Sequence, residues 1–171
     1  DGFRQSVLDA IKTVKWHPTW GEERMSEMIK GRNDWCISRQ RTWGVPLPIF
    51  YCKKCGEPYV TEESIKKIQD IFSKEGTNAW WAKEIKDLMP ENAKCAKCTH
   101  FKKETDIMDV WFDSGSTHQS VLVERGLDYP ADLYLEGNDQ YRGWFQSSLL
   151  TSVAVNGIAP YKEILSCGFV V

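Results

Sequence analysis

The sequence lacks several features that would place it in a special class of protein. No apolar run among its 171 residues reaches the roughly 18–20 residues that a membrane helix needs, so we expect no membrane span. The N-terminus shows neither a basic region nor an apolar stretch, which excludes a visible signal peptide. The formal net charge is only −2, so any contact with nucleic acid is expected to be local, through a few cationic side chains.

The composition that remains is that of an ordinary globular protein. Hydrophobic residues make up 42% of the chain and charged residues 27%, and the length suffices for one domain with a small appendage. The chain starts without Met and stops in the apolar run 168–171. We therefore expect a piece of a longer protein.

The spacing of apolar residues predicts a mixture of helices and strands. The predicted helices cover 3–14, 22–30, 61–76, 78–89 and 140–155. The predicted strands cover 49–51, 106–112, 131–136 and 163–171. The strand, helix and strand at the C-terminal end predict a βαβ unit, and hence a parallel sheet.

The two helices predicted between residues 61 and 89 carry expectations about burial. Thr61 is a plausible N-cap and Gly76 a plausible end for the first of them. The side chains expected to be buried are Ile65, Ile68, Ile71 and Phe72 in the first helix, and Trp81, Ile85 and Leu88 in the second.

Two C-x-x-C pairs, Cys52 with Cys55 and Cys95 with Cys98, predict a metal site. Two thiolates at that spacing hold one edge of a tetrahedral Zn²⁺ ion, and a second pair closes the site. The interval between the pairs exceeds the usual ~15–20 residues, and the helical insert accounts for the excess. A closed site of four thiolates is structural rather than catalytic. Disulfides, a redox pair, or His100 as a substitute ligand are the alternatives.

The segment from Glu136 to Trp144 is predicted to end a strand, pass through a glycine turn and enter a helix. Ligands of open α/β sheets bind beyond the carboxyl ends of such strands. The carboxylates of Glu136 and Asp139, beside Gly137, suit an ammonium group or ribose hydroxyls, and Trp144 is placed to close an apolar pocket. The structural alternative makes Asp139 an N-cap and Trp144 a core residue.

A second cluster, DVWFDSGS at 109–116, also combines a predicted strand with a turn of small residues. Trp111 is a candidate for lining the same pocket. Asp113 and Ser114 either hydrogen-bond a polar ligand or shape the turn.

Three segments carry a resemblance to a known family: DWCISRQRTWGVPLPIFYC, DVWFDSGS and YLEGNDQYRGWFQSSLLTSVAVNGIAPY. In this order they resemble the isoleucyl branch of the class I aminoacyl-tRNA synthetases, over nearly the whole chain. ISRQR-x-WG is shared with valyl and leucyl relatives, whereas EG-x-DQ-x-RGWF is typical of the isoleucyl branch. Asn138 and Tyr141 depart from the Ser and His that this branch often has.

The resemblance implies an α/β fold that comprises the second half of a Rossmann-type catalytic domain with a parallel sheet. It divides the chain into a helical and extended segment (1–51), a zinc-ribbon-like helical insertion (52–104) and the Rossmann half (105–171).

The resemblance also implies that isoleucine is joined to ATP, with Mg²⁺, and the resulting adenylate is passed to tRNA(Ile). The positions that match the family's adenylate site are Glu136, Gly137, Asp139, Gln140, Trp111 and Trp144. The first four match contacts to the adenylate, its amino group and its ribose, and the two Trp surround the aliphatic side chain.

The resemblance further implies a cytoplasmic protein, which we expect to be a monomer without membrane contacts. The family's His-Ile-Gly-His and Lys-Met-Ser-Lys-Ser motifs, which stabilise the transferring phosphate, are absent from these 171 residues. We therefore expect the chain alone to be inactive. The alternatives are a piece of a valyl enzyme, or a zinc-ribbon module that binds tRNA or protein without catalysis.

Overall fold

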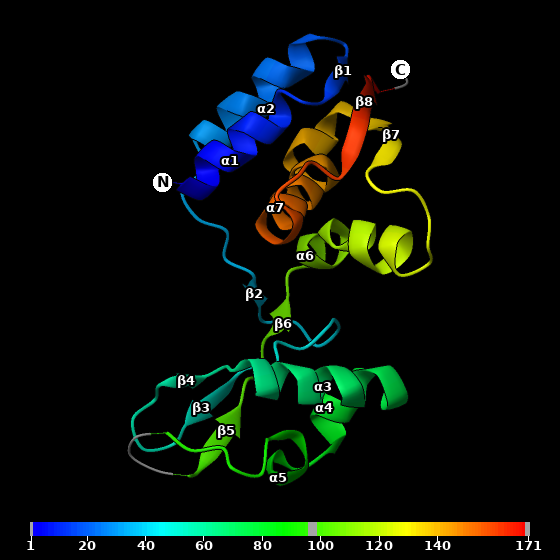
Figure 1. The fold of residues 1–171 in the computed structure, drawn as a ribbon. Helices are drawn as coiled ribbons and strands as arrows, with labels where there is room; N and C mark the ends of the chain where they lie inside the picture. Colours follow the sequence, from blue (N-terminus) through cyan, green and yellow to red (C-terminus); the bar gives the residue numbers. More distant parts are fainter. Residues whose placement is uncertain (1, 96–98, 170–171) are drawn as a thin grey trace. The chain divides into compact units, whose positions relative to one another are not determined.

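The computed structural model describes residues 2–95 and 99–169 and divides the chain into two compact units. The first unit comprises residues 1–37 and 109–171, and the second comprises residues 38–108 (Figure 1). The second unit includes more residues than the predicted insertion 52–104. Residues on either side of that insertion, in 38–39 and 107–108, pair with each other as antiparallel strands and so belong to the same unit. Among the described residues, no helix combines the length and apolar character needed to cross a bilayer.

The sheet of the first unit has three parallel strands in the order β1-β8-β7. These strands are β1 (Lys15–His17), β7 (Ala131–Gly137) and β8 (Tyr161–Cys167). Helix α7 (Trp144–Asn156) connects β7 to β8, so the predicted βαβ unit is confirmed. Strand β1 lies in the interval between the first two predicted helices, where the sequence predicted no strand. It forms because Trp16 pairs with Ile164, a partner far away in the sequence.

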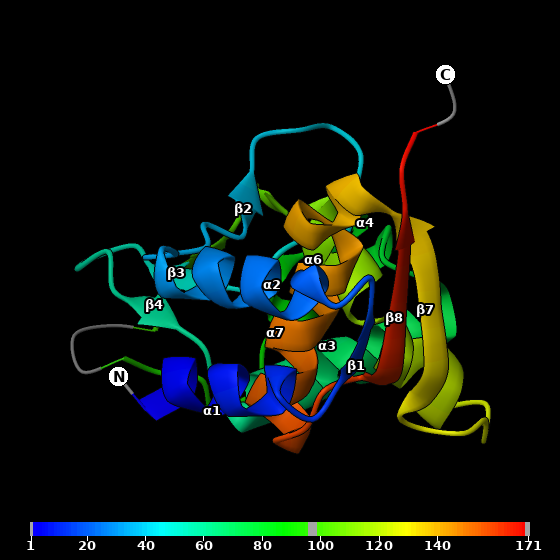
Figure 2. The ribbon, with the colours of Figure 1, turned by 90° about the horizontal axis from the view of Figure 1, so that it is seen from above.

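Three helices cover one face of this sheet: α1 (Gly2–Ile11), α2 (Trp20–Lys30) and α7 (Figure 2). The first two match the predicted helices 3–14 and 22–30. The core between helices and sheet is rich in aromatic rings. Its buried aromatic side chains are Trp16, Tyr134, Tyr141, Phe145 and Tyr161.

The stretch between the second unit and β7 differs from prediction. The predicted strand 106–112 is wrong beyond Met108, where α6 (Val110–Gly115) begins and leads to η1 (His118–Val123). Asp109 starts α6, because its Oδ1 accepts the Trp111 backbone N–H at 3.1 Å. Its Oδ2 accepts the Trp35 indole N–H at 2.9 Å, which fixes the carboxylate in place.

The described residues of the second unit form two small antiparallel sheets. One pairs β2 (Ser38–Arg39) with β6 (Ile107–Met108). The other has the order β4-β3-β5 and consists of β3 (Phe50–Cys52), β4 (Pro58–Tyr59) and β5 (Phe101–Lys103). Strand β3 matches the predicted strand 49–51 within one residue, and it delivers Cys52 to its carboxyl end.

Helix α3 (Glu62–Glu75) begins and ends as predicted. Thr61 Oγ1 accepts the Ser64 backbone N–H at 3.1 Å, and Ser64 Oγ accepts the Thr61 N–H at 2.9 Å, which completes a reciprocal cap. Gly76 ends the helix with φ +78°, a value that favours glycine. Ile68 is buried as predicted. The predicted burial of Ile65 is wrong, because this side chain is exposed.

The single helix predicted over 78–89 is replaced by two single-turn helices, α4 (Ala79–Ala82) and α5 (Ile85–Leu88). The structure also reverses the predicted burial of Trp81, which is 43% exposed, whereas Trp80 is 0% exposed. Long-range hydrogen bonds account for the difference. The Trp80 indole donates to the Glu104 carbonyl at 3.0 Å, and Lys103 Nζ donates to the Lys83 carbonyl at 3.0 Å at the end of α4.

Candidate functional site

The segment 136–144, called the 136–144 turn below, lies at the carboxyl end of β7. Glu136 is exposed there and pairs in register with Ser166 of β8. Asp139 and Gln140 then fall in η2 (Asn138–Arg142), a 3-10 turn, and α7 starts only at Trp144. The helix predicted over 140–155 therefore starts four residues late, and the intervening turn is free to carry polar side chains.

Hydrogen bonds link the polar side chains of the turn. Gln140 Nε2 donates to Asp139 Oδ2 at 2.9 Å, and Gln140 Oε1 accepts the Trp144 backbone N–H at 2.9 Å. Gln140, rather than Asp139, thus satisfies a backbone donor at the start of α7. Asp139 Oδ1 lies 2.6 Å from where a Cβ on Gly137 would stand, so glycine lets the carboxylate fold over the strand end.

Trp144 is held firmly at the end of the turn. Its ring stacks on Tyr134 with centroids 3.9 Å apart and an interplanar angle of 7°. Its indole N–H donates to the Ser114 carbonyl at 3.0 Å and to Thr117 Oγ1 at 3.2 Å. Burial raises the pKa of Tyr134 to about 12, despite hydrogen bonds that lower it, so this ring stays neutral. Tyr134 was not predicted as a site residue, although it precedes Glu136 by two positions on the same strand.

Trp111 reaches the same turn from α6. A Cβ on Gly143 would lie 2.9 Å from Cη2 of its ring, so the indole rests directly on the turn's backbone. The residue is 41% exposed. The structure therefore brings Trp111, Gln140 and Trp144 together at the turn, with Asp139 bonded to Gln140.

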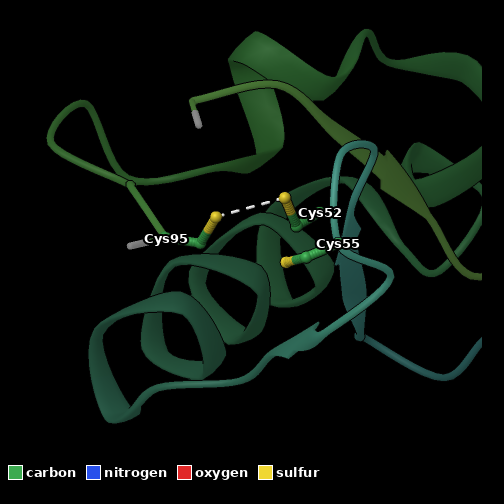
Figure 3. A group of neighbouring side chains, drawn as sticks. All are labelled: Cys52, Cys55 and Cys95. Carbon is green, nitrogen blue, oxygen red and sulfur yellow. Dashed lines mark hydrogen bonds between the residues drawn. The ribbon is translucent and has the colours of Figure 1, made fainter. Parts of the chain in front are cut away.

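The predicted metal ligands form a second cluster. The sulfur atoms of Cys52, Cys55 and Cys95 all lie within 4.8 Å of one another (Figure 3). The sulfurs of Cys52 and Cys95 are 3.1 Å apart. Tetrahedral zinc with bonds of about 2.3 Å separates its sulfurs by about 3.8 Å. The three thiols are close enough to share one ion, and the Cys52–Cys95 pair would move apart by about 0.7 Å on binding it. The fourth predicted ligand, Cys98, lies outside the described residues.

The backbone around Cys52 suits a thiolate. Lys54 donates its backbone N–H to Cys52 Sγ at 3.4 Å, and Gly56, with φ +75°, donates to the Cys52 carbonyl at 2.9 Å. The Glu57 backbone N–H is the largest single influence on the pKa of Cys55 and lowers it, but Cys52, desolvation and Cys95 together raise it by more. A bound divalent cation stabilises thiolates against this repulsion.

A separate cavity of about 440 Å³ opens within the first unit. Its apolar walls include Val7, Ile29, Trp35, Phe112 and Leu150. Arg32 borders it, and burial lowers the pKa of this guanidinium, which donates to Gln146 Oε1 at 2.6 Å. None of the six predicted adenylate residues lines this cavity, so it is distinct from the 136–144 turn.

His118 is buried at the start of η1, and we expect it to make the stability of the first unit depend on pH. Desolvation lowers its pKa below the ordinary 6.5, although a hydrogen bond from its ring to the Gly115 carbonyl at 2.9 Å opposes the shift. The unfolded chain therefore takes up a proton first, and the first unit loses stability as the pH falls below about 6.5. The loss is at most about 1.4 kcal/mol per pH unit.

Urea titrations at pH 7.5 and 5.5 measure this dependence. The variant His118→Gln is expected to show a smaller difference between the two midpoints than the unsubstituted chain. Equal differences in the two proteins would rule out His118 as the source.

The family model for tRNA synthetases class I (I, L, M and V) matches residues 1–171. The chain belongs to this family of class I tRNA synthetases. The sequence resemblance is thereby confirmed, and the α/β fold with its parallel three-stranded sheet is that expected of the family.

Individual members of the family agree with this assignment. The chain is 62% identical over 171 residues to an isoleucine–tRNA ligase of Brevibacillus brevis, covering 99% of the chain and 18% of that protein. It is 60% identical over 173 residues to the isoleucine–tRNA ligase of Caldicellulosiruptor saccharolyticus, covering 99% of the chain and 19% of that protein. The chain thus spans about a fifth of the length of these curated relatives.

A solved synthetase structure shares the fold. The LeuRS–tRNA–LeuAMS ternary complex of Agrobacterium radiobacter K84 matches with a TM-score of 0.50 and 24% identity, covering 80% of this chain and 19% of that one. This likeness concerns the fold alone.

Proposed function

We propose that the full-length protein containing this chain is an isoleucine–tRNA ligase, which activates isoleucine with Mg²⁺–ATP and transfers it to tRNA(Ile). The supporting observation is the identity of about 60% with isoleucine–tRNA ligases over 99% of the chain. This identity favours the ligase over a valyl enzyme and over a free-standing zinc module. We propose a monomer that acts in the cytoplasm.

The 136–144 turn is proposed to hold the amino-acid side of the adenylate. Glu136 and Asp139 supply negative charge for the ammonium group and acceptors for ribose hydroxyls, and Gly137 leaves room for the ligand. Gln140 orients Asp139 through their 2.9 Å hydrogen bond. Such pre-organisation lowers the entropy lost on binding.

Trp111 and Trp144 are proposed to enclose the branched side chain of isoleucine. The stack on Tyr134 and the two indole hydrogen bonds hold Trp144 in one orientation. Trp111 rests on Gly143 and offers a partly exposed face. A rigid aromatic wall recognises an aliphatic side chain by the area it buries.

The proposal is tested with Glu136→Gln in the full-length protein. Hydrogen bonds to a charged group contribute roughly 1.5–3 kcal/mol, so the KM for isoleucine in ATP–pyrophosphate exchange is expected to rise roughly 10- to 100-fold. Asp132→Asn is the matched control, because Asp132 is an exposed carboxylate on the same strand that pairs with Lys162. An unsubstituted protein that activates valine and not isoleucine would overturn the proposed substrate.

The residues 52–104 are proposed to form a zinc-ribbon-like insertion. Cys52, Cys55 and Cys95 would hold Zn²⁺, with Cys98 as the fourth ligand. The support is the convergence of three thiols from two separate segments. A zinc ion bound by four thiolates has no open coordination position, so its contribution is to the fold of this insertion.

A further inference from the structure

Helices α6 and α7 approach each other at two glycines. A Cβ on Gly115, at the end of α6, would lie 2.9 Å from the backbone carbonyl carbon and oxygen of Ser147 in α7. Rotation of a side chain cannot relieve a collision with backbone atoms. Only a residue without a Cβ therefore allows α6 to lie this close to α7.

Side chains of α7 also hold the end of α6. Thr151 Oγ1 donates to the Gly115 carbonyl at 2.8 Å, and the Trp144 indole donates to the Ser114 carbonyl at 3.0 Å. These bonds satisfy carbonyls that the end of a helix leaves without intrahelical partners. The position of α6 is thus set by contacts with α7 at Gly115.

Trp111 stands four residues before Gly115, on the same face of α6. Gly143 stands four residues before Ser147, whose backbone N–H donates to the Gly143 carbonyl at 2.9 Å. The two pairs meet in register: Gly115 faces Ser147, and Trp111 rests on Gly143. Any outward shift of α6 at Gly115 must therefore lift the Trp111 ring from the 136–144 turn.

We propose that Gly115 and Gly143 are positioning residues that set how closely Trp111 approaches the turn, and hence the size of the site for the aliphatic side chain. This inference rests on the proposed function. Gly115 acts through the backbone of α7, and Gly143 acts on the ring directly. Neither glycine contacts the substrate by this mechanism.

The test uses Gly115→Ala in the full-length protein. The KM for isoleucine is expected to rise on the order of tenfold, the preference for isoleucine over valine in kcat/KM is expected to fall, and the KM for ATP should stay within about twofold. Gly2→Ala is the matched control, because a Cβ at Gly2 meets nothing within 4 Å.

A double-mutant cycle separates positioning from general damage to the fold. In a Trp111→Phe background the ring atoms that meet Gly143 are gone, so Gly115→Ala is expected to change the KM for isoleucine by less than about twofold. An equal effect in both backgrounds, or no effect in either, would overturn the inference.

If Gly115→Ala does not fold, Gly143→Ala takes its place, since the three atoms nearest to a Cβ at Gly143 belong to the side chains of Gln140 and Trp111 and not to the backbone. The same changes in KM are then expected, and an unchanged KM for isoleucine would overturn the inference. The proposed function fails separately, if the unsubstituted protein shows no isoleucine-dependent exchange.

Discussion

Removal of zinc is expected to unfold the second unit, residues 38–108. Three thiols from the end of β3, the turn after it and the segment before β5 converge within 4.8 Å. A unit this small gains little net stability from its own core. Zinc binding contributes about 10–16 kcal/mol in zinc-finger peptides, and this free energy is coupled to folding.

Amide hydrogen exchange of the second unit, with and without a chelator, measures the effect. The variant Cys52→Ser is expected to bind no zinc and to lose most of the protection of the β3 and β5 amides from hydrogen exchange. Cys36→Ser is the control, since Cys36 lies in the first unit, outside the thiol cluster. Protection that persists in metal-free protein would contradict a structural role for zinc.

Trp80→Ala is expected to destabilise the second unit by about 3–5 kcal/mol, the range typical of truncating a large buried aromatic residue. Trp80 is 0% exposed, and its ring centroid lies 5.1 Å from that of Phe50. The substitution also removes the indole donor to the Glu104 carbonyl.

The adjacent Trp81→Ala is the matched control, because Trp81 is 43% exposed. We expect it to cost about 1 kcal/mol or less. Urea unfolding of the zinc-loaded chain, followed by hydrogen exchange in β3 and β5, compares the two variants. Equal losses would show that the two indoles share the core.

Structural features that depend on a few neighbouring residues were predicted well. The periodicity of α1 and α2, the cap at Thr61 and the end of α3 at Gly76 all depend on local backbone chemistry. The C-x-x-C spacing likewise predicted that Cys52 and Cys55 would share a site, and Cys95 joins them in the structure. The roles of Glu136, Asp139 and Gln140 in binding stay predictions.

Errors arose where a distant partner decides the outcome. The Asp106–Phe112 strand prediction followed apolar spacing, but the bond from the Trp35 indole to Asp109 helps to start a helix there instead. Strand β1 exists through its pairing with β8. The choice of Trp80 over Trp81 depends on carbonyl and amine partners more than 20 residues away.

The residues of the 136–144 turn could be named from the chain alone, because carboxylates, glycines and tryptophans in that order restrict the chemistry. Their arrangement could not. Trp144 stacks on Tyr134, and Trp111 meets Gly143, only once α6 packs on α7 and β7 pairs with β8. The sequence states each residue's type, and its local conformation depends largely on its neighbours along the chain. Contact between rings depends instead on how whole helices and strands pack.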